Sequence, residues 1–281
     1  MKIGIFGGFL GLALVFACVR GAVAQTAPGP TPTPDPCAGL LAELNRPSIG
    51  YSPCAAEAGT DVLELGYQHE LLGPQSTLAS QTQLGQGFLR FGVAQRLEVD
   101  FIGPNLDIQR GALGEASGLS DSGLGFKYEL PPTQRWQIGI DGLYTTPSGA
   151  TAFTTGNATY TTNLDASYQL TPATSLGATL SLASTGGFGR DGSHARFGAF
   201  TPSALVLEQI DGSTQAFVEY VNDSRVAPDA GDRGLLDAGL QHLVGARLEI
   251  DVEYGHALTE DAFVRFDYVG AGVGILLGGP P

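Results

Sequence analysis

The feature that most constrains this chain is an alternation of apolar with polar or glycine residues, which recurs in twelve segments after residue 60. A period of two places successive side chains on opposite faces of a β-strand. In the first segment, Leu63 and Leu65 share one face and Glu64 lies on the other. Strands with one apolar and one polar face build either a water-soluble sandwich or a membrane barrel.

The connections between these segments favour the barrel, because outer-membrane barrels alternate tight turns with longer loops. The predicted tight turns lie at residues 94–95, 131–134, 171–173, 211–213 and 244–246. Longer stretches lie between them at residues 110–120, 147–157, 185–199 and 223–233, and shorter outer loops lie near residues 73–77 and 259–261. Tight turns after the even-numbered strands place both chain ends on the periplasmic side. We therefore predict an all-β, antiparallel up-and-down transmembrane β-barrel of 12 strands over residues 61–281, with both termini periplasmic.

The N-terminal 24 residues have the composition of a signal peptide. Lys2 precedes a long apolar run, and Ala22-Val23-Ala24 supplies the small residues that signal peptidase accepts. No later window has the ~20 consecutive apolar residues that a spanning helix needs. We expect export, removal of residues 1–24, and residence in the outer membrane of a Gram-negative bacterium.

Residues 25–60 are expected to lie outside the barrel. Alternate prolines over residues 25–36 favour an extended linker without hydrogen-bond donors. Residues 37–60 form a short periplasmic lead-in bounded by Cys37 and Cys54, which we expect to pair as a disulfide in an oxidising compartment. Zinc is the alternative, but two cysteines without nearby histidines supply only half of a tetrahedral site.

Charge and motif content exclude several functions. The formal net charge of −14 at pH 7 argues against nucleic-acid binding, because no basic stripe could displace counterions from phosphates. Residues 187–192 match a G-x-G-x-x-G pattern, but a strand follows in place of the helix that phosphate binding requires. A catalytic pair at Ser193 and His194 is the remotest hypothesis. We expect no catalytic residues, no metal, no cofactor and no enzymatic activity.

The polar faces of the strands carry many carboxylates and few cations. The predicted lumen-lining residues, which would set ion selectivity, are Glu64, Arg90, Glu98, Asp100, Lys127, Glu129, Asp141, Asp165, Asp237, Glu249, Asp251, Glu253, Arg265 and Asp267. An open lumen of this charge would favour cations, whereas a filled lumen would be a polar core. The inner-face glycines Gly66, Gly125 and Gly139 favour open space.

The facing of side chains is least well defined in two of the segments. Residues 203–210 and 215–221 alternate less cleanly, and Glu208 and Glu219 are expected to face inward. In the last strand, Phe266 and Tyr268 are expected to face lipid.

Several short motifs carry a resemblance to a known family. They are Asn45-Arg46-Pro47, Gly66-Tyr67, Leu89-Arg90-Phe91-Gly92, Arg96-Leu97-Glu98, Gly123-Leu124-Gly125-Phe126-Lys127-Tyr128 and Thr146-Pro147-Ser148-Gly149. In order and spacing they resemble the outer-membrane β-barrel family of MetA-pathway phenol-degradation proteins. The resemblance implies a transporter for hydrophobic or aromatic small molecules.

The leading hypothesis is an outer-membrane channel or transporter for small solutes, preferring cations or carrying hydrophobic or aromatic compounds. The alternative is a non-conducting structural or adhesive barrel whose outer loops bind partners. The expected partners are outer-membrane lipid, small-molecule solutes and the barrel-assembly machinery.

Overall fold

The computed structural model describes residues 36–73, 76, 78–112, 114–259, 261 and 265–279. The predicted signal peptide and all of the predicted linker except Pro36 lie outside these residues. No helix among the described residues is long and apolar enough to cross a membrane.

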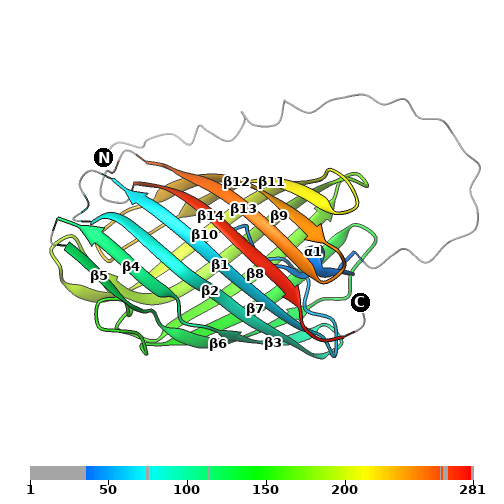
Figure 1. Cartoon of the computed structure of the whole chain (residues 1–281), viewed down its shortest axis with the longest axis horizontal. Coiled ribbons are helices and arrows are strands. Elements are labelled where there is room, and N and C mark those ends of the chain that lie inside the picture. The colour runs from blue at the N-terminus through cyan, green and yellow to red at the C-terminus, as the bar shows by residue number, and fades with distance from the viewer. Residues whose placement is uncertain are drawn as a thin grey trace, which may run out of the picture. The chain divides into compact units, whose positions relative to one another are not determined.

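The described strands form one antiparallel sheet that closes on itself, because β1 pairs with both β14 and β2 (Figure 1). The strands are β1 (Asp61–Leu72), β2 (Leu78–Ala94), β3 (Leu97–Ile102), β4 (Leu106–Gly111), β5 (Gly114–Leu119), β6 (Ser122–Glu129), β7 (Trp136–Thr146), β8 (Thr159–Gln169), β9 (Thr174–Phe188), β10 (His194–Gln209), β11 (Thr214–Asp223), β12 (Arg233–Val244), β13 (Leu248–Leu258) and β14 (Phe266–Leu276). One short helix, α1 (Leu40–Glu43), precedes them.

The fourteen strand segments build twelve barrel strands, as predicted. Both β3 and β4 pair with β2, while β6 pairs with β3 and β5 pairs with β4. Therefore β3 and β4 together form one barrel strand, interrupted at residues 103–105, and β5 and β6 together form another, interrupted at residues 120–121. Among the described strands, every one except β5 pairs with a strand on both sides, which is what strands in lipid require. β5 pairs with β4 alone, at the end of the barrel opposite β3 and β6.

The two ends of the barrel differ. Val62 near the start of β1 pairs with Leu276 at the end of β14, so these two strand ends lie together at the end that also carries the short turns, hereafter the turn end. The opposite, loop end carries the longer connections. Two expected loops are shorter than predicted, because β4 and β5 extend over most of residues 110–120 and β9 and β10 over most of residues 185–199. Stretches rich in glycine and serine are typical of loops. Here their backbone groups form hydrogen bonds with a neighbouring strand, so the stretches are strands.

The outward face is apolar and the inward face is polar. On β6, Leu124 and Phe126 are 58% and 50% exposed, whereas Lys127 between Phe126 and Tyr128 is 1% exposed. This is the reverse of a water-soluble fold, in which large apolar side chains avoid the surface. Aromatic residues on neighbouring strands meet on the outer face, as Trp136 and Tyr168 do at 4.8 Å between ring centroids.

The predicted facing of β14 is wrong. Phe266 and Tyr268 are buried inside the barrel, Arg265 is exposed, and Asp267 lies on the outer face, where it contacts His256. In an alternating Phe-Asp-Tyr pattern, the aromatic side chains can face either the lipid or the lumen. Hydrogen bonding decides which face they take. The Tyr268 hydroxyl donates to buried Asp237 at 2.8 Å, which an outward tyrosine could not do.

The two glutamates on the weakly alternating strands face opposite sides of the barrel wall. Glu219 on β11 is fully buried in the lumen, as predicted. Glu208 on β10 is exposed and accepts a hydrogen bond from Thr174. Its predicted inward facing is wrong, because it shares its face with exposed Val206 and lies at the turn end, where a carboxylate reaches water.

Candidate functional site

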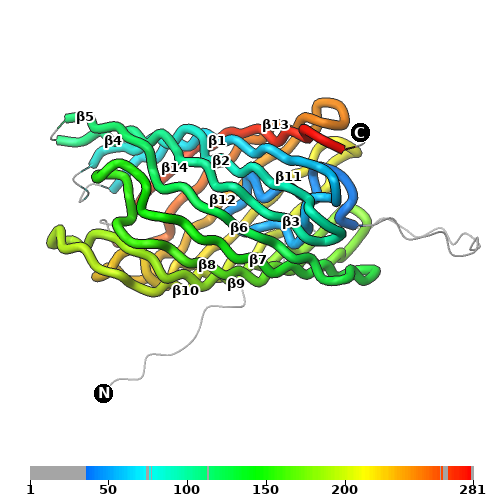
Figure 2. The backbone as a smooth tube through the Cα atoms, turned by 90° about the horizontal axis from the view of Figure 1, so that it is seen from below, coloured from blue at the N-terminus to red at the C-terminus, as the bar shows by residue number. Residues whose placement is uncertain are grey.

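Most of residues 36–60, hereafter the luminal segment, lies inside the barrel and not beside it (Figure 2), with residues 38–39 and 57–59 exposed. The predicted disulfide between Cys37 and Cys54 is present and closes the segment into a loop. Leu40 and Leu44 pack with Val62 of β1 in a buried apolar cluster. Because this segment lacks strand periodicity, the sequence predicts a lead-in outside the barrel. In the lumen, the polar backbone groups of the segment find partners on the barrel wall, as the following contacts show.

Inward carboxylates bind the backbone amides of the luminal segment. Glu64 Oε2 accepts hydrogen bonds from the amides of Asn45 at 3.1 Å and Arg46 at 2.9 Å. Glu219 accepts from the amides of Ile49 at 2.8 Å and Gly50 at 2.9 Å. These charge-assisted bonds satisfy donors that would otherwise be buried without partners.

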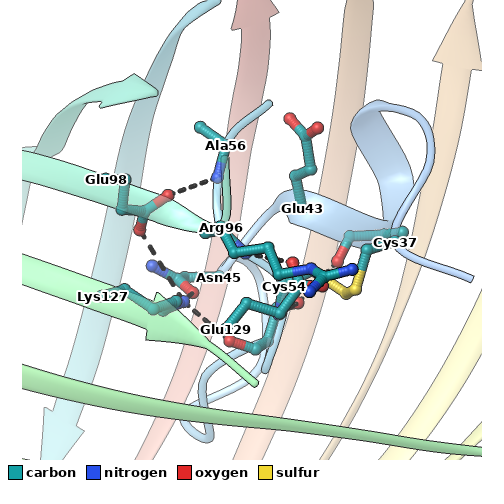
Figure 3. Close-up of a disulfide and its surroundings, with 12 residues drawn as sticks. Cys37, Glu43, Asn45, Cys54, Ala56, Arg96, Glu98, Lys127 and Glu129 are labelled. Atoms are coloured by element: carbon teal, nitrogen blue, oxygen red, sulfur yellow. Dashed lines mark hydrogen bonds and ion pairs between the residues drawn. A yellow bond between two sulfur atoms is a disulfide. The ribbon is translucent and has the colours of Figure 1, made fainter. Parts of the chain in front are cut away.

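Two further carboxylates hold the stretch after Cys54. Glu98 accepts from the amide of Ala56 at 2.5 Å, and Glu129 accepts from the amide of Ala55 at 3.3 Å. Figure 3 shows Glu98 reaching from the barrel wall to Ala56, close to the disulfide. Four of the carboxylates on the barrel wall thus serve as anchors for the segment.

Arg90 is the centre of the buried charge network. It is fully buried, and its guanidinium lies 2.8 Å from Glu64 Oε1 and 2.8 Å from Glu98 Oε2. It also donates to the carbonyl oxygens of Glu43 and Cys54 in the luminal segment. A buried arginine with two carboxylates and two carbonyls has most of its donors satisfied, which its desolvation requires.

Lys127 and Arg46 complete the network from opposite sides. Lys127 Nζ donates to Asn45 Oδ1 and to the Ser52 carbonyl, both at 2.7 Å. Arg46, which the luminal segment itself supplies, lies 3.1 Å from Asp251 and 3.7 Å from Glu253. The segment therefore supplies Arg46 to the acidic wall, and its own oxygen atoms bind Lys127 on another part of that wall.

Inner-face glycines make room for the luminal segment. A Cβ added at Gly139 would lie 2.5 Å from the Pro53 carbonyl oxygen, and one at Gly66 would collide with the Arg46 guanidinium. At Gly125 it would lie 2.6 Å from Leu143 of the barrel itself. The expectation that these glycines leave open space is wrong, because they permit close packing.

The luminal segment also carries a buried acid of its own. Burial raises the pKa of the Glu43 carboxyl to about 7, and nearby Arg90 opposes part of that rise. At neutral pH this group is thus close to half ionised, in contrast to an exposed glutamate.

In the part of the chain that the structure describes, a cavity lies on each side of the segment. The cavity toward the turn end has a volume of about 410 Å³, and the cavity toward the loop end has a volume of about 490 Å³. Both are lined by Arg46, Ser48 and Tyr51. Residues 46–51 therefore form a septum between two spaces large enough for small molecules.

The structure places most of the predicted lumen-lining residues inside and divides them by role. Those that contact the luminal segment or its cations are Glu64, Arg90, Glu98, Lys127, Glu129, Asp251 and Glu253. Those that are buried without an ion pair among the described residues are Asp100, Asp141, Asp165, Asp237 and Glu249. Arg265 and Asp267 do not belong to the lumen.

Sequence reasoning missed the residues that the luminal segment contributes, above all Glu43, Arg46 and Tyr51. A signal was present, because Asn45-Arg46-Pro47 is one of the motifs that carry the family resemblance. Arg90, Glu98 and Lys127 belong to other such motifs, and the structure brings all of them into one network.

Comparisons with known proteins agree with this architecture. The family model described as "Putative MetA-pathway of phenol degradation" matches residues 55–274. Among solved structures, the COG4313 outer membrane channel from Pseudomonas putida F1 has a TM-score of 0.65 at 14% identity, covering 82% of this chain and 100% of that one. The NanC porin has a TM-score of 0.52 at 12% identity, covering 77% and 98%. No curated relative matches the chain. The fold is that of bacterial outer-membrane channels.

Proposed function

Since this chain belongs to the family of the MetA pathway of phenol degradation, an outer-membrane barrel family, we propose that it is a passive channel for small uncharged or cationic solutes, without catalytic activity. The turn end, with both barrel termini, faces the periplasm in this proposal. The observation that carries it is the pair of cavities that meet at the septum of residues 46–51.

The charge of the loop-end cavity supports the exclusion of anions. Its ionisable lining consists of Glu64, Glu70, Asp121, Asp223 and Glu253, with Arg46 and Arg233 as the cations. Carboxylates in excess lower the free energy of cations and raise that of anions in a confined space of low dielectric constant.

The aromatic lining of the same cavity supports ring-shaped solutes. Tyr51 and Phe88 meet edge to face with centroids 6.1 Å apart, and Phe266 stacks with Tyr268 at 5.9 Å. Aromatic faces bind flat apolar rings, and the neighbouring carboxylates accept hydrogen bonds from hydroxyl groups. A small hydroxylated aromatic compound fits both features, and it agrees with the phenol in the family description.

Passage requires the septum to move. The septum is held by hydrogen bonds to its backbone and by the Arg46 ion pair, not by apolar packing alone. Such contacts exchange with water and solute groups more readily than a packed core rearranges. The route is therefore narrow and gated in this proposal, and single-channel currents should be small and intermittent.

Planar-bilayer recording of the purified full-length protein tests the proposal. We expect ion currents with reversal potentials that favour cations in a salt gradient. Liposome swelling in excess of that of protein-free liposomes should be greater with phenol than with benzoate, which has the same ring but a negative charge. Absence of current, together with phenol entry no faster than into protein-free liposomes, would overturn the proposal and favour the non-conducting barrel. Preference for anions would overturn the charge argument.

A further inference from the structure

Three oxygen-bearing side chains lie together on the inner face of β7 and β8. Asp141 pairs in register with Asn163, and Gly139, two residues before Asp141, pairs with Asp165. Asp165 is therefore the diagonal neighbour of Asp141 on the same face, and their carboxyl groups interact. All three side chains are buried, with Asp141 1%, Asn163 4% and Asp165 0% exposed.

Each of these side chains uses one oxygen or nitrogen atom and leaves one oxygen atom unbound. Asn163 Nδ2 donates to Asp141 Oδ1 at 2.7 Å, and Thr179 Oγ1 donates to Asp165 Oδ1 at 2.7 Å. Among the described residues, Asp141 Oδ2, Asp165 Oδ2 and Asn163 Oδ1 are buried and have no hydrogen-bond partner. Three acceptor atoms are thus left in one small region.

The cations of the lumen form no ion pair with these aspartates. Lys127 lies directly opposite Asp141 in the strand register and attracts Asp165, but its ammonium group donates to Asn45 and Ser52. Arg90 is bound by Glu64 and Glu98. No ion pair among the described residues involves Asp141 or Asp165.

Two adjacent buried carboxylates without an ion pair are unfavourable when both are ionised, so they share a proton or bind a positive ion. A shared proton would satisfy the two aspartates but not the Asn163 amide oxygen, which is not protonated at physiological pH. A hard cation satisfies all three, because carboxylate and amide oxygens are the ligands that Ca²⁺ prefers. Two carboxylates also match the charge of a divalent ion.

We propose that Asp141, Asn163 and Asp165 form a binding site for a hard divalent cation, with Ca²⁺ as the best fit. Residues 51–53 of the luminal segment cover the site. The Tyr51 amide donates to Thr179 Oγ1 at 3.1 Å, Thr179 in turn donates to Asp165, and the Pro53 carbonyl lies against Gly139. Cation binding therefore stabilises the docked segment. This site does not depend on whether the barrel conducts.

Titration calorimetry on the full-length protein, stripped with a chelator and held in detergent, tests the site with Ca²⁺ alone and Mg²⁺ alone. We expect one Ca²⁺ per chain and weaker Mg²⁺ binding, because Mg²⁺ demands near-ideal octahedral geometry and loses its water ligands reluctantly. Asp165→Asn and Asn163→Leu should each weaken Ca²⁺ binding at least tenfold. Asp237→Asn, a buried aspartate bound by Tyr268 on another part of the wall, is the matched control and should leave the affinity unchanged.

Luminescence of Tb³⁺, which replaces Ca²⁺, gives a second measurement on the same samples. Tyr51→Phe should reduce the sensitised emission while heat-modified gel mobility shows that the barrel remains folded. If the folded wild-type protein binds no Ca²⁺, or if Asp165→Asn and Asn163→Leu both retain the wild-type affinity, the aspartates share a proton and the proposal fails. Unaltered emission in folded Tyr51→Phe would contradict coverage by the luminal segment.

Discussion

The guanidinium of Arg46 lies 3.1 Å from Asp251, although 205 residues separate them in the sequence. The N-terminal segment thus supplies a counterion to the far wall of its own barrel. The same guanidinium lies 3.7 Å from Glu253, so one arginine interacts with two carboxylates. The charge of the lumen therefore depends on whether the segment is docked.

Replacing Arg46 with alanine should increase the single-channel conductance several-fold and strengthen the cation preference. The change removes both a septum side chain and the positive charge beside Asp251 and Glu253. Bilayer recording measures both quantities. Arg110→Ala is the control, since Arg110 pairs with Glu115 in an exposed hairpin. An unchanged conductance in Arg46→Ala would show that the septum does not limit flow.

Replacing Glu219 with alanine should expose the backbone of residues 49 and 50 to exchange. Glu219 is the acceptor for both amides, and each buried donor left unsatisfied costs about 1–3 kcal/mol. Hydrogen exchange measured by mass spectrometry should become at least tenfold faster in this stretch. Glu208→Ala is the matched control, because Glu208 is an exposed glutamate on the neighbouring strand. Equal exchange in both variants would contradict the anchoring role.

Replacing Gly139 with alanine should displace the luminal segment while the barrel still folds. The added Cβ would lie 2.5 Å from the Pro53 carbonyl, a backbone atom that must shift as a whole. Limited proteolysis should cut residues 36–60 faster than in the wild type. Gly231→Ala provides the comparison, because nothing lies within 4 Å of a Cβ at that glycine. Equal protection of the segment in both variants would disprove the close fit.

Docking of the luminal segment should weaken as the pH rises toward neutrality. Burial raises the pKa of Glu43 from 4.5 to about 7, so the neutral carboxyl is the form that fits the lumen. Its stabilisation is complete below about pH 4.5 and is lost as the pH rises through about 7, a change on the order of 3 kcal/mol.

Protease protection of the segment, measured from pH 4 to pH 9, checks this dependence. Glu43→Gln keeps the size and the neutral charge at every pH, so its protection should fall less between pH 4 and pH 9 than that of the wild type. A wild-type profile that is flat, or one that rises with pH, would contradict the assignment to Glu43.

Strands β6 and β14 show how well the sequence predicts which side chains face the lipid and which face the lumen. On β6, bulky apolar residues alternate with Lys127 and Glu129, and the predicted facing is confirmed. On β14, aromatic residues alternate with charged ones, and the facing was reversed, because a tyrosine can pack in lipid or donate a hydrogen bond inside. Only a partner such as Asp237, distant in the chain, decides between the two.

The residue pattern is sufficient to predict the twelve-stranded barrel, the outer membrane as its location and the pairing of Cys37 with Cys54. These follow from local physics: a period of two, short turns, and two cysteines in an oxidising compartment. What fills the lumen depends on contacts between residues that are distant in the chain. Residues 36–60 have no periodicity that names a partner, and their amides and Arg46 find carboxylates on strands far along the chain. Buried charge must be neutralised wherever the fold places it, and that place is a property of the closed barrel.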